Sequence, residues 1–256
     1  MNKDRRRFLK LLTSYFGLLA AKDGVYVRLL GGENLSQDST ADAEAYNPED
    51  HLYAYAIDTR KCIGCGMCVK ADRLENKVPP KNFRTWVERY RISEAGDVDI
   101  DSPSGGENGF PPRVSGFNVA KAFFVPKLCN HCRHTPCIQV CPVGASFHTP
   151  EGVVMVDSGW CIGCGYCVQA CPYGSRFINP ETHCADKCTL CYHRLVKGLQ
   201  PACVQACPVG ARQFGDLKRA GDPVRQLIAR ERVMVLQPTL LTKPNCYYLG
   251  LDQGVR

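Results

Sequence analysis

Short apolar runs that lead into cysteine-rich loops are the strongest pattern along this chain. The segments LYAYAIDTRKC (52–62) and GVVMVDSGWC (152–161) alternate apolar and polar positions and predict strands, since successive side chains in a strand point to opposite faces. Each run enters a loop rich in glycine and cysteine, and a short helical stretch such as CVQAC (167–171) follows. The pattern therefore predicts an internal repeat of strand, cysteine loop and short helix.

Three further stretches lie outside this repeat. Residues 76–127 carry the runs RTWVERYRI and AFFVP around a turn rich in Gly, Pro and Ser (102–116), and they predict a β-rich insert. Residues 216–256 predict a tail that wraps around the core rather than folding alone. Residues 33–51 mix Ser, Asp and Glu and are typical of a linker arm.

Composition narrows the function classes. The 256 residues include 17 cysteines, a count typical of disulfide scaffolds, zinc proteins or iron–sulfur proteins. The formal net charge is +7, but residues 1–30 hold seven basic and two acidic side chains, which leaves the rest nearly neutral. A nucleic-acid-binding protein would instead cluster its basic residues on a folded face, so we expect no nucleic-acid partner.

The N-terminus has the features of a targeting segment. In residues 1–32 the run RRRFLK resembles a twin-arginine export signal, with Arg5 and Arg6 as the pair and Phe8 and Leu9 next to them. The apolar run from Leu11 is shorter than the roughly 20 residues that a membrane span needs. The alternative is a basic amphipathic first helix. We expect export of the folded protein to the periplasmic face of the membrane, with the segment cleaved or kept as a tether, and peripheral membrane association.

Fifteen of the cysteines form four motifs. They are Cys62-x2-Cys65-x2-Cys68-x3-Asp72, Cys129-x2-Cys132-x4-Cys137-x3-Cys141-Pro142, Cys161-x2-Cys164-x2-Cys167-x3-Cys171-Pro172 and Cys188-x2-Cys191-x11-Cys203-x3-Cys207-Pro208. Motif one (CIGCGMCVKADR) and motif three (CIGCGYCVQACP) follow one template for ten positions, and then Asp-Arg replaces Cys-Pro.

The spacing of these motifs indicates iron–sulfur clusters. The run C-x2-C-x2-C-x3-C-P is that of bacterial ferredoxins: three thiolates surround one cluster, while the fourth cysteine points toward a second. The motifs are thus expected to work in pairs. Disulfides between cysteines two residues apart would be strained. Zinc sites use C-x2-C pairs, but they do not explain repeated triplets with Cys-Pro ends.

With a widened second and fourth motif, the chain resembles the four-cluster ferredoxin-like subunits of molybdopterin and related membrane oxidoreductases. The segment CPYGSRFINPETHCADKCTLCYHR, between the third and fourth motifs, is also similar to that family. The resemblance implies an α+β fold of two pseudo-symmetric bacterial two-cluster ferredoxin-like modules, with a β-rich insert and long irregular loops. The first module would comprise residues 52–75 and 183–215, and the second residues 128–182.

In that family motif one pairs with motif four, and motif two with motif three. The resemblance therefore implies four ligand sets. They are Cys62, Cys65, Cys68 and Cys207 for cluster one; Cys188, Cys191 and Cys203 with position 72 for cluster two; Cys129, Cys132, Cys137 and Cys171 for cluster three; and Cys161, Cys164, Cys167 and Cys141 for cluster four.

Position 72 leaves three possibilities for cluster two. In the first, one iron has no thiolate and a three-iron cluster results. In the second, the Asp72 carboxylate binds that iron. In the third, Cys184 replaces the missing ligand. Thiolate suits iron–sulfur iron better than carboxylate does, so the three-iron form is favoured. The expected cofactors are three [4Fe-4S] clusters and one [3Fe-4S] or atypically ligated [4Fe-4S] cluster.

Several residues near the motifs are expected to play lesser parts. Outside the question of cluster two, Cys184 is expected to be a small buried apolar residue, as is Cys246. His131 and His134 flank motif cysteines, and they are expected either at the surface or as hydrogen-bond donors to cluster sulfurs.

The resemblance implies a non-catalytic electron-transfer subunit, and no catalytic residue is expected. Because we expect the chain to carry its own export signal and no C-terminal anchor, it looks more like the periplasmic subunits of the sulfite-reduction-associated complex, menaquinone reductase or nitrite-reduction systems. The implied partners are a polytopic quinone-interacting membrane subunit and a cytochrome or molybdopterin subunit. The alternatives are a free periplasmic polyferredoxin and a catalytic subunit with an open iron at position 72.

Overall fold

The computed structural model describes residues 46–113 and 116–255. The predicted export signal, with Arg5, Arg6, Phe8 and Leu9, lies outside these residues. The strands are β1 (Tyr53–Asp58), β2 (Thr85–Ser93), β3 (Val98–Asp101), β4 (Val119–Leu128), β5 (Ser146–His148), β6 (Val154–Val156), β7 (Phe177–Ile178), β8 (Ala185–Asp186), β9 (Arg212–Asp216), β10 (Val233–Met234) and β11 (Cys246–Leu249). The helices are α3 (Met67–Asn76), α4 (Pro136–Gln139), α5 (Tyr166–Gln169), α6 (Tyr192–Leu195), α7 (Ala202–Gln205) and α8 (Pro223–Arg230), and 3₁₀ turns span Pro48–Asp50, Pro103–Gly106 and Pro238–Leu240.

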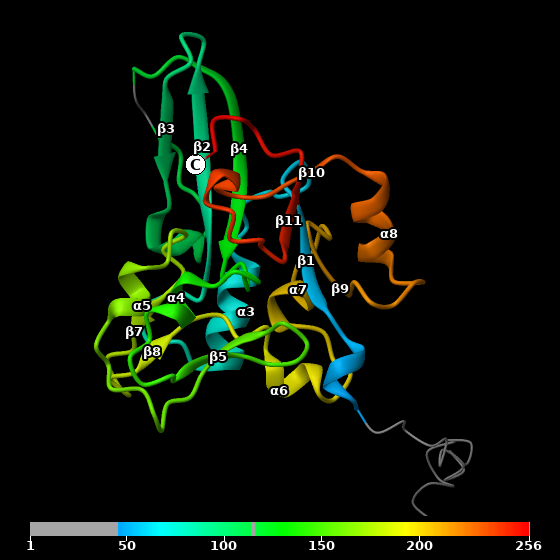
Figure 1. Ribbon diagram of the computed structural model, residues 1–256. Helices are drawn as coiled ribbons and strands as arrows, with labels where there is room; N and C mark the ends of the chain where they lie inside the picture. The colour runs from blue at the N-terminus through cyan, green and yellow to red at the C-terminus, as the bar shows by residue number, and fades with distance from the viewer. Residues whose placement is uncertain (1–45, 114–115, 256) are drawn as a thin grey trace, which may run out of the picture. The chain divides into compact units, whose positions relative to one another are not determined.

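The largest sheet joins distant parts of the chain in the order β10-β11-β1-β9. Strand β1 pairs antiparallel with β9 and parallel with β11, so a blue strand from early in the described chain and a red strand from late in it lie side by side (Figure 1). All six residues of β1 are buried, because it is a central strand and α8 packs Val224 against Ala56 and Leu249. The C-terminal tail thus adds two strands and a helix to the core.

A second sheet, of order β3-β2-β4, is formed by the region predicted as a β-rich insert. Figure 1 shows these strands standing apart from the short helices. The sheet has a stacked pair of Tyr90 and Phe123 on one face, and Arg89 forms an ion pair with Asp101 at 2.8 Å. The strands predicted for RTWVERYRI, AFFVP, 52–62 and 152–161 are all confirmed as β2, β4, β1 and β6.

The length of the helix in each motif depends on whether a proline follows the fourth ligand position. Helices α4, α5 and α7 have four residues each and end before a Cys-Pro pair, because proline cannot continue the helical hydrogen bonds. Motif one has Asp72-Arg73 instead, and α3 runs on to Asn76. The substitution at position 72 therefore changes the backbone as well as the side chain.

Helices and strands are mixed, which agrees with an α+β fold, and the remaining sheets are the pairs β5-β6 and β7-β8. In the described part of the chain, no helix has both the length and the apolar character needed to cross a bilayer.

Candidate metal centres

The first thiol group combines the ends of motifs one and four. Cys62 and Cys65 lie on the loop between β1 and α3, Cys68 lies in the first turn of α3, and Cys207 follows α7. Burial raises the pKa of the Cys62 thiol to about 11, and the nearby Cys68 and Cys207 thiols act in the same direction. Cys65 is exposed, whereas Cys68 is buried. The structure thus brings together all four residues expected to bind cluster one.

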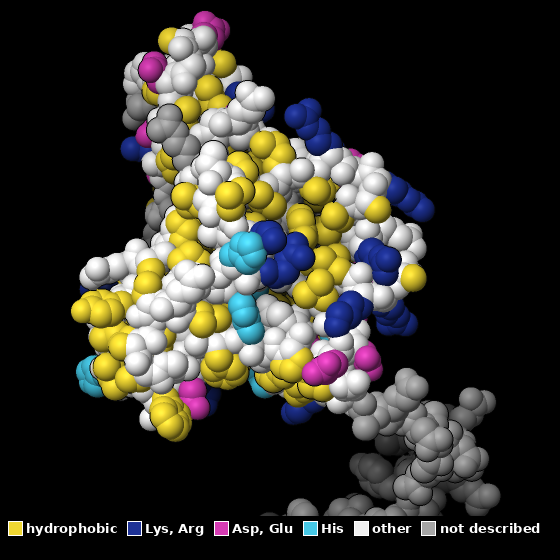
Figure 2. Space-filling model, viewed as in Figure 1, with side chains coloured by type: hydrophobic (Ala, Val, Ile, Leu, Met, Phe, Trp, Pro, Cys, Tyr) yellow, Lys and Arg dark blue, Asp and Glu magenta, His cyan; other side chains and the backbone are white. Residues whose placement is uncertain are grey.

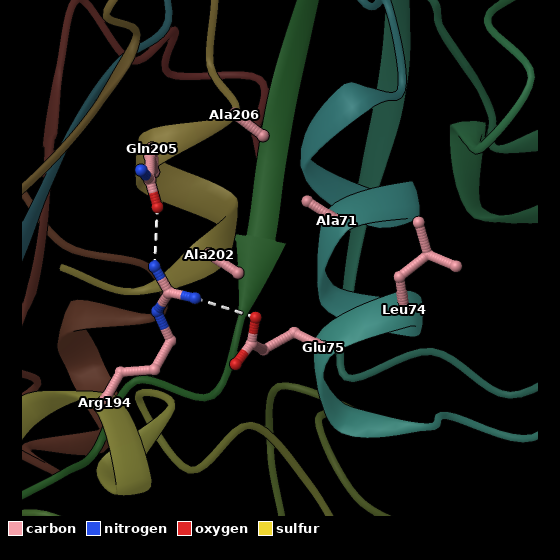
Figure 3. A pocket seen from close by; sticks show the side chains of 7 residues that line it. All are labelled: Ala71, Leu74, Glu75, Arg194, Ala202, Gln205 and Ala206. Carbon is pink, nitrogen blue, oxygen red and sulfur yellow. Dashed lines mark hydrogen bonds and ion pairs between the residues drawn. The ribbon is translucent and has the colours of Figure 1, made fainter. Parts of the chain in front are cut away.

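Helices α3 and α7 hold these two motifs together. They face one another across a shallow surface pocket, and Arg194 bridges them (Figure 3). Its guanidinium donates to Glu75 of α3 at 2.8 Å and to Gln205 of α7 at 2.6 Å. These bonds fix the spacing between the two helices that follow the ligand loops.

The second group contains Cys188, Cys191 and Cys203, all buried, with Asp72 among them. Burial raises the pKa of Asp72 to about 6, against the opposing effect of Arg84 and Arg212. Burial also raises the pKa of Cys188, and the Asp72 carboxyl adds to that shift. The carboxyl of Asp72 is therefore close enough to these thiols to interact with them strongly.

Two polar side chains contact this group. The side-chain amide of Asn76 donates to Asp72 Oδ1 at 2.8 Å and to the sulfur of Cys191 at 3.4 Å. The Tyr55 hydroxyl lies 3.3 Å from the sulfur of Cys203. Asn76 reaches this position only because α3 continues past Asp72.

Cys184 lies elsewhere. Its thiol donates to the carbonyl oxygens of Ser158 and Cys161, and it is half-buried rather than fully buried as expected. Burial and the neighbouring Cys161 thiol raise the pKa of Cys184. The structure thus groups Cys184 with motif three and Asp72 with motif four.

The third group surrounds a small internal cavity. Its walls include Cys129, Cys132, Cys137 and Cys171, the four residues expected to bind cluster three. Burial raises the pKa of Cys132 to about 12, and the other three thiols contribute in the same direction. Motifs two and three therefore meet around one space.

The fourth group is built from motif three and the end of motif two. Cys167 is buried, Cys161 is half-buried and Cys164 is exposed. Cys141 follows α4, which packs against α5, the helix of Cys167. Burial raises the pKa of Cys141, but backbone N–H groups of residues 143–146 outweigh that effect, and the net pKa is lowered. Amide donors around a thiolate are a common environment for a metal ligand.

Electrostatic interactions and packing between the groups give their order. Cys68 of the first group acts electrostatically on Cys203 of the second. Cys129 of the third group raises the pKa of Cys188, after burial and the Asp72 carboxyl. Cys137 of the third group packs with Cys167 of the fourth. The thiol groups therefore form one series, in which the first and fourth are the ends.

The buried residues fit an anionic cofactor. Among the described residues, no three of His, Cys, Asp and Glu lie close enough together to share one metal ion. The four thiol groups and the side chains packed among them form the thiol core. In this core, two guanidinium groups have N–H groups for which the described residues supply no hydrogen-bond partner: Nε and Nη2 of Arg176, and Nε and Nη1 of Arg212. An unpaired buried cation is costly, so both side chains suit a core that holds anionic iron–sulfur clusters.

The remaining expectations have mixed outcomes. Cys246 is buried, as predicted. The surface prediction is wrong for His131, which is 2% exposed because it lies beneath β6, where its Nδ1 accepts from the Val154 amide at 3.0 Å. His134 is at the surface, and its Nδ1 lies 3.2 Å from the Leu241 carbonyl oxygen.

Sequence reasoning missed the contacts of Asn76 and Tyr55 and the buried cations Arg176 and Arg212. A signal for the cations was present. CPYGSR (171–176) and CPVGAR (207–212) place an arginine five residues after the last cysteine of motifs three and four.

Comparisons with known proteins agree with this arrangement. Two matches to the 4Fe-4S dicluster domain cover residues 61–145 and 120–217. The chain is 43% identical to a tetrathionate reductase subunit of Salmonella typhimurium over 80% of this chain and 74% of that protein. It is 36% identical to protein NrfC of Escherichia coli over 99% of this chain and 98% of that protein. It is 33% identical to one of the chains of polysulfide reductase from Wolinella succinogenes, over 79% of this chain and 96% of that protein.

Proposed function

The chain belongs to the iron–sulfur subunits of molybdopterin oxidoreductase complexes, and we propose that it passes electrons along four clusters between two different partners. It is an electron-transfer subunit. The clusters supply the one-electron chemistry, and the chain's own residues hold them, order them and set their surroundings. The proposed ligands are the four sets that the resemblance implies, with Asp72 at the fourth position of cluster two.

The observation that carries this proposal is that the thiol groups at the two ends of the series each contain an exposed cysteine. The second cysteine of each motif occupies an equivalent place in its loop. At the first and fourth groups these cysteines, Cys65 and Cys164, are exposed, whereas Cys132 and Cys191 in the inner groups are buried. An electron can thus enter at one end and leave at the other, while the inner groups stay insulated from solvent.

Apolar side chains next to both exposed cysteines support a partner at each end. Ile63 is 57% exposed and Met67 45% beside Cys65, and Ile162 is 64% exposed and Tyr166 59% beside Cys164. Figure 2 shows hydrophobic side chains projecting near α4 and α5. Exposed apolar groups clustered around a functional residue are typical of a docking surface.

The proposed partners are a polytopic quinone-interacting membrane subunit and a molybdopterin or cytochrome subunit. Similar proteins that carry the names of tetrathionate, polysulfide and selenate reductases support a catalytic molybdopterin partner. The RRRFLK run supports export by the twin-arginine route to the periplasmic face. In this arrangement the subunit does not bind the reducible substrate.

Co-purification from membranes tests the docking surfaces. The tagged native chain is expected to retain two partners after mild solubilisation, whereas Ile63→Glu and Ile162→Glu each lose a different one. Leu240→Glu, at an exposed apolar position in the tail, is the matched control and should keep both. A fully loaded protein that is found only as a free monomer would instead support a diffusing polyferredoxin.

Cluster two is proposed to differ from the other three. Asp72 supplies a carboxyl where the other sets have a thiol, and a [3Fe-4S] cluster is the favoured form. An oxidised three-iron cluster is paramagnetic, whereas oxidised four-iron clusters of this type give no EPR signal. EPR of the air-oxidised protein is therefore expected to show a signal. A silent sample with sixteen irons would favour ligation by Asp72 instead.

A further inference from the structure

Three buried cations lie within the thiol core. The exposed fractions of Arg176, Lys187 and Arg212 are 4%, 1% and 2%. In the part of the chain that the structure describes, the other buried Lys and Arg side chains are Arg91 and Lys127 of the β3-β2-β4 sheet, which pair with Asp99 and Glu88. Within the described residues, no carboxylate forms an ion pair with any of the first three. Their charge must therefore be balanced by the groups around them.

Each of the three interacts with cysteines of two successive thiol groups. Arg212 interacts with Cys68 of the first group and Cys203 of the second. Lys187 interacts with Cys129 of the third group and Cys188 of the second, and its Nζ donates to the carbonyl oxygens of Cys188 at 2.8 Å and of Val154. Arg176 interacts with Cys137 of the third group and Cys167 of the fourth. Each pair of successive thiol groups is thus linked by one buried cation.

The two arginines occupy equivalent positions in the repeat. In CPYGSR and CPVGAR, Arg176 and Arg212 stand five residues after Cys171 and Cys207, each just before or at the start of a strand. Each has one N–H group anchored by a hydroxyl: Arg176 Nη1 donates to Ser146 Oγ at 2.9 Å, and Arg212 Nη2 donates to Thr85 Oγ1 at 2.6 Å. The hydroxyls fix the direction in which the remaining N–H groups point.

A fixed positive charge between two anionic clusters stabilises the added electron on either one. It raises the reduction potentials of both neighbours, and it weakens the repulsion between electrons on adjacent clusters. The effect falls with distance, so more remote clusters should change little.

We propose that Arg176, Lys187 and Arg212 are charge bridges that raise the reduction potentials of the two clusters flanking each residue, so that electrons meet no strongly unfavourable step along the series. The inference rests on the proposed ligand sets. The two arginines carry its test, because their charge does not depend on pH.

The test is an EPR-monitored redox titration of the fully loaded complex. Arg212→Gln is expected to lower the potentials of clusters one and two, with a shift of at least tenfold in the one-electron equilibrium, which corresponds to 59 mV. Arg176→Gln is expected to shift clusters three and four by a similar amount and to leave cluster two unchanged. Arg91→Gln is the matched control, since Arg91 is a buried cation outside the thiol core, and no potential should change.

Iron and labile sulfide content separate this inference from the proposed function. Native protein that lacks the expected clusters contradicts the ligand sets, whereas full content with unchanged potentials in Arg212→Gln and Arg176→Gln contradicts only the charge bridges. Equal shifts of all four clusters in either variant would also overturn them. If a glutamine variant loses iron, the same redox titration is made on Arg212→Lys and Arg176→Lys. They keep the charge, so full iron content and near-native potentials are expected, and a large fall in the flanking potentials refutes the inference.

Discussion

Equivalent glycines in the two repeats make a sharp test of the packing around cluster one. Gly66 and Gly165 both precede a helix, α3 or α5, and both have left-handed φ angles, +74° and +77°. A side chain in this conformation costs about 1–2 kcal/mol. Backbone conformation alone therefore predicts equal effects of Gly66→Ala and Gly165→Ala.

The structure predicts unequal effects. A Cβ at Gly66 would overlap the backbone carbonyl oxygens of Gly106 and Glu107, whereas a Cβ at Gly165 has nothing within 4 Å. Backbone cannot rotate away as a flexible side chain can, so the clash adds about 1–3 kcal/mol. For a folded unit of this size that difference corresponds to roughly 2–12 °C in Tm.

Anaerobic thermal unfolding of the fully loaded proteins measures the effect. Gly66→Ala is expected to melt well below Gly165→Ala and to lose iron from cluster one first. Equal melting temperatures for the two variants would refute the packing of the 3₁₀ turn at Pro103–Gly106 against the motif-one loop.

Three further outcomes are expected. Asp72→Cys should complete the ligands of cluster two, raise the iron content and abolish the EPR signal of the oxidised protein; a persistent signal would contradict the role of position 72. Tyr55→Phe removes a hydrogen bond to Cys203. It should lower the potential of cluster two by roughly 40 mV, taking about 1 kcal/mol for the bond, whereas Tyr90→Phe, whose hydroxyl donates to Glu88, should not. Removing iron with a chelator and an oxidant should unfold the core, since Arg176 and Arg212 would then be buried without anions; unchanged near-UV circular dichroism would argue against this.

The local features of this protein were readable from its sequence. Cysteine spacing predicted the triplets and the iron–sulfur chemistry, because three ligands within seven residues are brought together by one loop. The strands β1, β2, β4 and β6 followed from their apolar patterns, and the short helix α5 within motif three followed from the predicted repeat of strand, cysteine loop and short helix. In each case neighbouring residues carry the information.

Contacts between distant segments could not be read in this way. The parallel pairing of β11 with β1 joins residues about 190 positions apart, and the pattern predicted only a wrapping tail. The burial of His131 depends on β6 and on Asn245, whose side chain donates to the His131 carbonyl oxygen at 3.0 Å. Such pairings depend on the whole core rather than on local periodicity.

The sequence by itself determined which residues can bind clusters and that position 72 differs. The resemblance implied that position 72 lies with Cys188, Cys191 and Cys203, and the structure places Asp72 there. Only the tertiary structure decided that Cys184 lies elsewhere and that Arg176, Lys187 and Arg212 are buried among the thiol groups. Among 32 Lys and Arg residues, nothing in composition marks these three. Their charges act through burial and proximity, and both arise from segments that are far apart in the sequence and meet only in the folded core.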